Sequence, residues 1–317
     1  MNSGGPMLVA QYAVNGLLVG AVFALIGLGF SLVWGILNII NLAHAAFIML
    51  GAYFTWMLVE HASIDPLLTV PIVALILFAI GYAMQRGLLN LVMRAPLLTT
   101  FLLTFGLETL ILNLGQRIWS ADTRSVPVAY SGKGIVLTSS GIDFGRPGME
   151  TSVVVPFVAL IACGIALGLF VATYLLMERT RSGRAIRAVG ADITAARLMG
   201  IDIGHTYALT FGVSAALAGA AGSLIAMQQG FSPATFGAFN IRAFIVVILG
   251  GLGSVPGVLA GGLVFGLIDQ FSQAPLPGGG IFGWSSLARI KDVIFFVVLL
   301  IVLIVRPTGL LGREGYR

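Results

Sequence analysis

Apolar runs of more than twenty residues recur along this sequence and constrain its fold more than any other feature. The first is Leu8–Trp34, and two more, Val153–Met177 and Tyr207–Gln228, enclose a charged stretch. About 20 apolar residues span the hydrocarbon core of a bilayer as a helix. A water-soluble fold could not cover its surface here, since 58% of residues are hydrophobic and 9% are charged. We therefore predict an all-α polytopic membrane protein with about eight or nine membrane helices.

Further crossings are expected from the other apolar runs. Strand-like alternation is missing, which argues against a membrane β-barrel. Small residues at GxxxG spacing let helices approach closely in lipid, although chance alone could give such pairs among 42 glycines. The additional runs are Ala45–Glu60, Leu67–Gln85, Leu97–Ile118 and Val293–Val305, and the glycine pairs are Gly16/Gly20, Gly164/Gly168 and Gly262/Gly266.

Charges give the expected orientation of a single membrane domain, residues 1–317. The loop 179–204 carries five arginines and should be cytoplasmic, because basic loops stay inside. The tail with Arg306, Arg313 and Arg317 should also be inside. The loop 61–65 has no base, and we expect it and the mixed loop 119–151, whose TSSGIDFG segment predicts turns or a short hairpin, on the periplasmic side. A further loop is expected at 275–283, and Trp284 suits the membrane interface.

The cytoplasmic loop contains signals for a short helix. Asp192 can cap the backbone N–H groups of Thr194 and Ala195. Residues Ile193–Met199 are adequate helix formers, and Gly200 stands where a left-handed residue would end them. We expect this helix to lie across the membrane surface and to face a partner below it.

A glycine-rich segment, Gly250–Gly257, interrupts the apolar stretch Ile241–Gln270. Irregular backbone cannot lie exposed to lipid, because its polar groups need partners. The pattern favours a broken hairpin of two short helices that dip into the membrane and return, as in many transporters. It is not a phosphate-binding loop, because no Lys-Ser/Thr follows the glycines.

Polar side chains within the spans are the candidates for a transport route. Asn38, Asn41 and His44 are three residues apart, so a helix would place them on one face. That face either makes interhelical hydrogen bonds or lines the route, with Asn240 and Ser254 as further candidates near the hairpin. Two ionisable residues, Glu108 and Asp269, are candidates for an ion or proton site. Glu108 could instead have a structural role, held by a partner such as Arg117 or Asn113.

No catalytic constellation is visible in the sequence. Three histidines, the single Cys163 and scattered acids form no metal-spaced cluster, and no nucleophile–base pair can be recognised. A Walker A motif is also missing, so this chain alone is not expected to hydrolyse ATP. An intramembrane enzyme stays open as an alternative, although no residue argues for it; we expect a chain that is not itself an enzyme and binds no cofactor.

Several segments, in order, resemble the permeases of branched-chain amino acid ABC transporters. The charged loop, GRAIRAVG followed by Asp192 and Gly200-Ile-Asp, is similar to the coupling loop of that family. The similarity continues through Asn41-Leu-Ala-His, the Gly250–Gly262 run and the terminal Arg306-Pro-Thr-Gly-Leu. The chain is most similar to the shorter of the two permease subunits.

The resemblance implies a multi-pass permease of the bacterial inner membrane that imports branched-chain or related hydrophobic amino acids. It implies pairing with a second homologous permease, two cytoplasmic ATPases that hold ATP and Mg, and a periplasmic binding protein. Related systems take urea or short amides, and an ion-coupled secondary carrier remains the alternative class. The residues implied in coupling are Arg184, Arg187, Asp192, Ala195, Arg197 and Gly200.

Overall fold

The computed structural model describes residues 5–93, 96–128, 130, 132–138, 141–145, 153–273, 291–306 and 308–312. The expected loop 275–283, Trp284 and the tail arginines Arg313 and Arg317 lie outside these ranges. The chain divides into two compact units, which are described separately. Unit 1 comprises Met1–Ala24, Pro127–Leu167 and Ile245–Arg317, and unit 2 comprises Leu25–Val126 and Gly168–Phe244.

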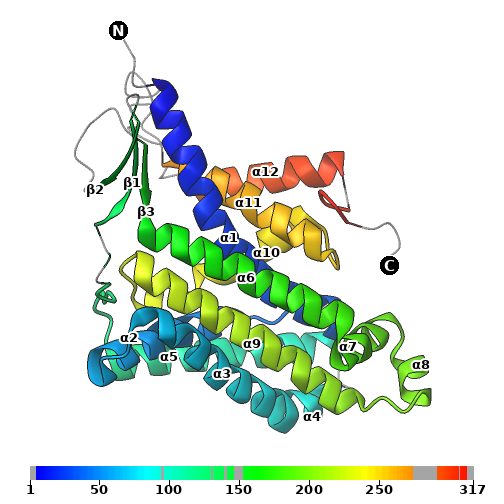
Figure 1. Ribbon diagram of the computed structural model, residues 1–317. Coiled ribbons are helices and arrows are strands. Elements are labelled where there is room, and N and C mark those ends of the chain that lie inside the picture. Colours follow the sequence, from blue (N-terminus) through cyan, green and yellow to red (C-terminus); the bar gives the residue numbers. More distant parts are fainter. Residues whose placement is uncertain are drawn as a thin grey trace. The chain divides into compact units, whose positions relative to one another are not determined.

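Helices dominate the described residues (Figure 1). Within these residues, eight helices are long and apolar enough to cross a membrane, and Val293–Val305 is a shorter apolar helix, which confirms the predicted all-α class. The elements are α1 Gly5–Leu37, α2 His44–Ala62, α3 Pro66–Met84, the π-helix η1 Gln85–Leu89, α4 Asn90–Val92, α5 Leu97–Trp119, α6 Phe157–Arg179, α7 Arg181–Ala191, α8 Ile193–Leu198, α9 Ile203–Gln228, the 3-10 turn η2 Pro233–Thr235, α10 Ala238–Gly250, α11 Val255–Ser272 and α12 Lys291–Val305.

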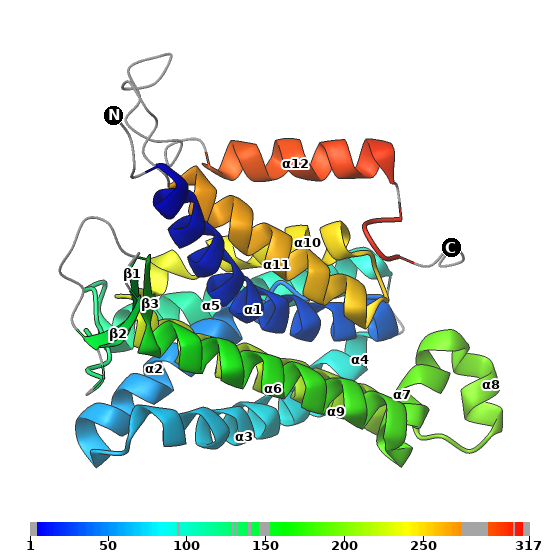
Figure 2. The same ribbon diagram turned by 45° about the horizontal axis from the view of Figure 1, so that its top comes forward.

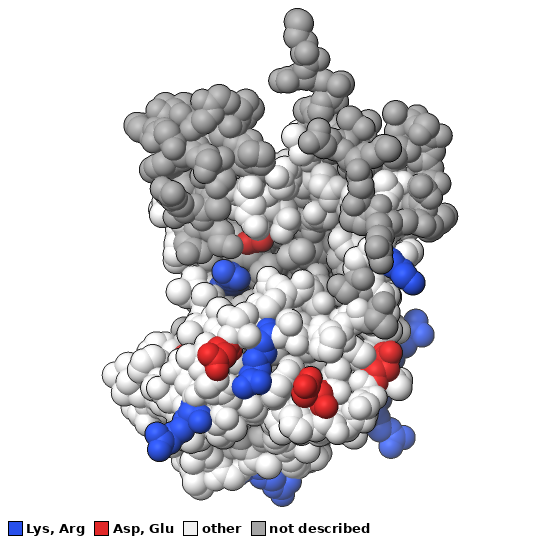
Figure 3. Space-filling view, turned by 90° about the vertical axis from the view of Figure 1, so that its left-hand side faces the viewer, with Lys and Arg blue, Asp and Glu red and all other residues white. Residues whose placement is uncertain are grey.

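On the face shown in Figure 3, charged side chains are few among the described residues, and most are surrounded by uncharged ones. Such a surface is stable where most of it faces lipid or protein and not water.

The core of unit 2 is α9, which packs between α2 and α3. Most of α9 is buried, and its sequence is rich in Gly and Ala. A side chain on Gly219 would collide with Leu77 of α3, and one on Gly222 would collide with the backbone of α2 at Ile48. Small residues thus let the helix backbones approach, which provides the packing that association in lipid depends on.

Small residues also allow close helix packing in unit 1, where the predicted glycine pair Gly16/Gly20 faces the pair Gly262/Gly266. A Cβ on Gly20 would lie 2.9 Å from the Gly262 carbonyl oxygen, and one on Gly16 would lie 2.9 Å from the Leu267 Cα. The first part of α1 therefore packs closely on α11. The third pair, Gly164 and Gly168, has no atom of the described residues within 4 Å of such a Cβ, so it makes no close helix contact within this part of the chain.

A small antiparallel sheet precedes α6. Its strands are β1 Gly134–Thr138, β2 Gly141–Gly145 and β3 Val153–Pro156, in the order β2-β1-β3. The hairpin expected around TSSGIDFG is thus confirmed. The apolar run Val153–Met177, however, begins with the strand β3 and becomes helical only at Phe157. The Gln11 side chain donates to the Val154 carbonyl (2.8 Å) and accepts from its N–H (2.6 Å), so it covers the open edge of β3.

The glycine-rich break lies between α10 and α11, as predicted. Gly251 and Gly253 have φ of +102° and +75°, which other residues rarely adopt. Its two arms are α10, of 13 residues, and α11, of 18 residues. With the turn before α10 included, the candidate spans Pro233–Gly250 and Val255–Ser272 each have 18 residues, long enough for a crossing, and the expectation that the two arms dip and return stays a prediction.

The backbone of this break finds its partners in a distant segment. Leu310 N–H donates to the Leu249 carbonyl (2.9 Å), and Leu311 N–H donates to the Gly250 carbonyl (3.1 Å). These carbonyls end a helix and would otherwise lack a donor. A side chain on Gly309, which has φ of +81°, would collide with the backbone of Gly251, and one on Gly251 would collide with the backbone of Thr308 and Gly312.

Candidate functional site

The charged loop of unit 2 is built as two consecutive helices, α7 and α8. Helix α7 was not predicted, although local signals for it exist. The Thr180 hydroxyl accepts from the Gly183 N–H (3.0 Å) and so caps α7. Ile186 and Val189, three residues apart, are both 1% exposed and fix its inner face.

Helix α8 has the predicted caps. The Asp192 carboxylate accepts from the N–H groups of Thr194 (2.7 Å) and Ala195 (3.0 Å), and Gly200 has φ of +80°. The Gly200 N–H donates to the Arg197 carbonyl (3.0 Å), which satisfies the end of the helix. The helix ends at Leu198, one residue earlier than expected.

The outer surface of α8 combines apolar and basic side chains. Leu198 and Met199 are 84% and 82% exposed, and the Arg197 side chain is exposed as well. Figures 1 and 2 show α7 and α8 beyond the ends of α6 and α9. A protruding apolar tip suits contact with another protein, since large exposed side chains of this kind gain stability when covered.

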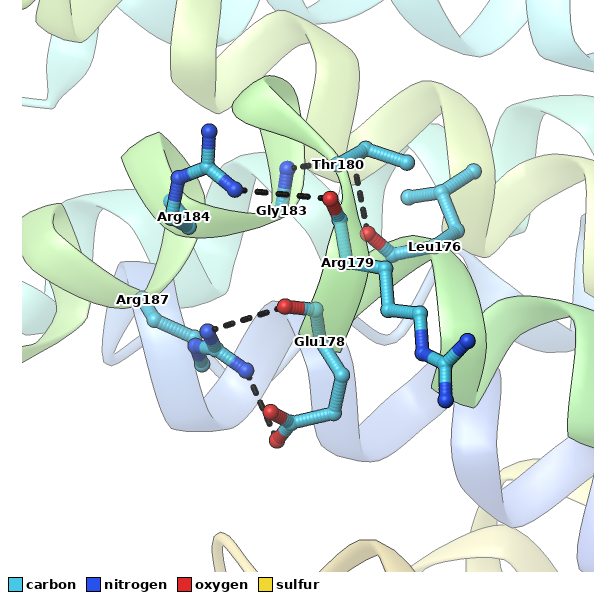
Figure 4. Close-up of polar contacts among 7 residues, drawn as sticks. All are labelled: Leu176, Glu178, Arg179, Thr180, Gly183, Arg184 and Arg187. Atoms are coloured by element: carbon cyan, nitrogen blue, oxygen red, sulfur yellow. Dashed lines mark hydrogen bonds and ion pairs between the residues drawn. The ribbon is translucent and has the colours of Figure 1, made fainter.

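Two arginines of α7 bond back to the end of α6 (Figure 4). Arg187 forms an ion pair with the Glu178 carboxylate (2.7 Å) and also donates to the Glu178 carbonyl (3.5 Å). Arg184 donates to the Arg179 carbonyl (3.4 Å). Cations at a helix C-terminus are favourable, so these residues help to orient α7 relative to α6.

A break between α1 and α2 forms the second candidate region. Asn38 has φ of +53° and ends α1, so residues 38–43 are not helical. The expectation that Asn38, Asn41 and His44 share one helical face is therefore wrong. Asn tolerates the left-handed region, which explains the stop. Asn38 is exposed, whereas Asn41 and His44 are 2% and 0% exposed.

Asn240 joins this break to two other helices. Its side-chain oxygen accepts from the Ala45 N–H (3.0 Å), and its amide donates to the Leu42 carbonyl and to the Glu108 carboxylate (2.6 Å). The partner of Glu108 is thus Asn240, and not Arg117 or Asn113. Asn113 instead donates to the Thr109 carbonyl in its own helix (2.7 Å).

His44 makes an interhelical hydrogen bond. Its Nε2 lies 3.1 Å from the Ile26 carbonyl of α1, so this nitrogen carries the proton. The other ring nitrogen, Nδ1, and the Asn41 Oδ1 are buried, and no described residue hydrogen-bonds to them. A side chain on Gly29 would lie 2.9 Å from the imidazole, so the ring fits only beside glycine.

A cavity of about 360 Å³ opens next to this cluster. It is lined by one face of α5 from Phe105 to Gln116, including Glu108, and by the turn at Pro233–Thr235 with Gly237. Phe105, Leu112 and Pro233 make most of the lining apolar, with amide and hydroxyl groups between them. Such a mixture suits a small amphipathic molecule.

The remaining candidates, both in unit 1, have local structural partners. The Ser254 hydroxyl accepts from the Gly257 N–H (3.1 Å) and caps α11. Asp269 is 7% exposed, and its carboxylate accepts from the Gln273 side chain (3.1 Å) near the end of α11. Among the described residues, no group of three or more His, Cys, Asp or Glu side chains could hold a metal ion.

Comparison with known proteins identifies the kind of transport system. A family model described as the permease component of branched-chain amino acid transport systems matches residues 12–303. The chain is 31% identical to the high-affinity branched-chain amino acid transport system permease protein BraD of Pseudomonas aeruginosa, over 96% of this chain and 95% of BraD. It is 30% identical to LivH of Escherichia coli over the same shares. It is also 30% identical to the E. coli permease protein LivM, over 78% of this chain and 61% of LivM.

Proposed function

Because this multi-pass membrane protein belongs to the family of branched-chain amino acid transport permeases, we propose that it forms one half of the membrane channel of an ABC importer. Its substrates are branched-chain or related hydrophobic amino acids, and its location is the bacterial inner membrane. Separate ATPase subunits hydrolyse ATP, and a periplasmic binding protein delivers the substrate.

Similarity to two different permease proteins of one organism supports a paired arrangement. LivH and LivM are each named as permease proteins of a high-affinity branched-chain amino acid transport system in E. coli. We assign the second half of the channel to a second, homologous permease.

The structure of α8 is the observation that carries the proposed mechanism. Its exposed tip at Leu198 and Met199 docks on an ATPase, and both of its ends are tied to membrane helices. Towards the N-terminus, α7 and the Arg187–Glu178 pair connect it to α6. Towards the C-terminus, Asp202 caps α9 by accepting from the His205 N–H (3.0 Å).

Movement of α8 therefore reaches the break between α1 and α2. Helix α9 packs against both α2 and α3, so it cannot shift without moving them. The break at residues 38–43 directly precedes α2. Because it is not helical, it has fewer backbone hydrogen bonds to break than the helices on either side. We assign it as the place where the route opens and closes.

Reconstituted transport tests this function. The chain is placed in proteoliposomes with its neighbouring permease and binding protein, with or without the ATPases. We expect ATP-dependent accumulation of leucine, isoleucine or valine, with urea as the comparison substrate. Concentrative uptake without the ATPases would contradict the proposal and favour a secondary carrier.

Accessibility to a membrane-impermeant thiol reagent tests the orientation. In a Cys163→Ala background, we expect Ser182→Cys, on α7, to be labelled only after the membrane is opened. Thr123→Cys, in the loop after α5, should be labelled in intact cells. The reverse pattern would place α8 on the wrong side for the ATPases.

A further inference from the structure

Glu108 lies at a depth that makes its charge unusual. It is the central residue of α5, since 108 − 97 and 119 − 108 are both 11. At about 1.5 Å per residue it lies roughly 16 Å from either end of the helix, near the middle of a hydrocarbon core about 30 Å thick. An ionisable group at this depth is costly and usually serves a function.

The carboxylate is held in one orientation, and no cation among the described residues pairs with it. Asn240 donates to its Oε1 (2.6 Å), and Asn240 is itself fixed by the backbone at Leu42 and Ala45. Within the described part of the chain, no Lys, Arg or His forms an ion pair with Glu108. The second carboxylate oxygen is left for whatever occupies the cavity that Glu108 lines.

The cavity matches a particular ligand chemistry. A carboxylate with a free oxygen attracts an ammonium group, which has three donors to place. Thr109, Asn113 and Gln116 offer further polar atoms along the same face of α5, and Phe105 and Leu112 offer apolar surface. A volume of about 360 Å³ lies at the lower end of the range for small-molecule sites.

We propose that this cavity binds a primary ammonium ion that carries a short aliphatic group, with Glu108 as its anchor. The inference rests on the proposed function, in which such an ion is the amino end of a hydrophobic amino acid in transit. A lipid amine is not the ligand, because head groups lie at the membrane surface and Glu108 lies near the midplane. A single charged anchor holds its ligand weakly, which suits a site that must release it.

Ligand-observed NMR on the assembled permease pair in nanodiscs tests the site. The probes are 3-methylbutylamine, leucine and 4-methylpentanoate. We expect the amine and leucine to bind at millimolar concentration and the pentanoate, which lacks an ammonium group, not to bind. Glu108→Gln should weaken amine binding at least tenfold while it keeps an acceptor for the Asn240 amide. Glu108→Asp should retain part of the binding.

A pair of glycine substitutions gives an independent steric test. A Cβ on Gly237 or on Gly106 meets no atom within 4 Å, so both positions accept valine, but only Gly237 lines the cavity. We expect Gly237→Val to reduce amine binding at least fivefold and Gly106→Val to leave it unchanged. This pair decides the question even if a Glu108 variant fails to fold.

The outcomes separate this inference from the proposed function. Absence of amine binding in the wild-type pair, or equal binding by the folded Glu108→Gln variant, would overturn the inference. If the site binds the amine but the assembled system shows no ATP-dependent uptake, the importer function is wrong and the ammonium site stands. If Glu108→Gln keeps full uptake, the site does not lie on the transport route and the importer function stands.

Discussion

Helix α8 and the Asn240 cluster are both held by side-chain hydrogen bonds, but the bonds connect very different distances along the chain. In α8, Asp192 bonds to residues two and three positions later. In the cluster, Asn240 bonds to Glu108 and to Ala45, from which it is separated by 132 and 195 positions. A local cap shapes one helix end, whereas a distant bond fixes how separate helices pack.

The difference also concerns exposure. The α8 segment is mostly exposed, so water can replace any bond that is lost. Asn240 is 6% exposed and Glu108 is 9% exposed, so a lost bond there leaves a buried polar group without a partner. Substitutions in α8 should therefore change coupling, and substitutions in the cluster should change folding.

The largest effect is expected for Asn240→Leu. It removes the partner of Glu108, of the Leu42 carbonyl and of the Ala45 N–H, at about 1–3 kcal/mol for each unpaired group. We expect a loss of roughly 3 kcal/mol or more of stability, measured by thermal melting in detergent. Asn113→Leu, which removes a bond within α5 on an exposed surface, is the control. Equal melting of both variants would show that the cluster does not hold the helices.

Gly200→Val should have the next largest effect, confined to coupling. A β-branched residue is strained at φ of +80°, by about 1–2 kcal/mol, and the end of α8 will tilt. We expect several-fold lower transport-linked ATPase activity with almost unchanged melting. Gly200→Asn should retain most of the activity, because asparagine tolerates this conformation. If valine and asparagine behave alike, backbone conformation at this position does not matter.

Asn41→Leu sharpens the comparison, because Asn41 is buried but its Oδ1 has no partner among the described residues. Its removal leaves no acceptor newly unsatisfied, so stability should fall by less than about 1 kcal/mol. We expect transport to fall about tenfold if this amide lines the route. A variant that melts as early as Asn240→Leu would make Asn41 a packing residue.

Arg187→Gln should have the smallest effect. The Arg187–Glu178 pair has side chains 43% and 48% exposed, and such pairs contribute about 0–1 kcal/mol. We expect an unchanged melting temperature and a modest loss of transport-linked ATPase activity. High salt screens the ion pair in the wild type, so the difference between wild type and variant should disappear there. A loss as large as that of Gly200→Val would show that the pair transmits movement from α8 to α6.

Local signals in the sequence were sufficient for much of the fold. The cap at Asp192, the left-handed Gly200 and the break at Gly250–Gly257 each depend on neighbouring residues, and the structure has them. The cap of α7 at Thr180 is equally local, although this helix was not predicted.

The polar cluster could not be predicted in the same way. No pattern in the sequence connects Glu108 with Asn240, because their contact depends on how α5 and α10 pack. The spacing of Asn38, Asn41 and His44 indicated a helical face, but a single left-handed residue, Asn38, ended the helix. Periodicity assumes an uninterrupted helix, and transport proteins interrupt helices where they function.

The contact between the glycine-rich break and the segment around Leu310 has a consequence for the order of synthesis. The carbonyls of Leu249 and Gly250 leave the ribosome well before the N–H groups of Leu310 and Leu311 that satisfy them. Until then, the end of α10 has no partner in this segment, and water or another donor must satisfy these carbonyls. The final pairing of α10 therefore forms only after α11 and α12 have been synthesised.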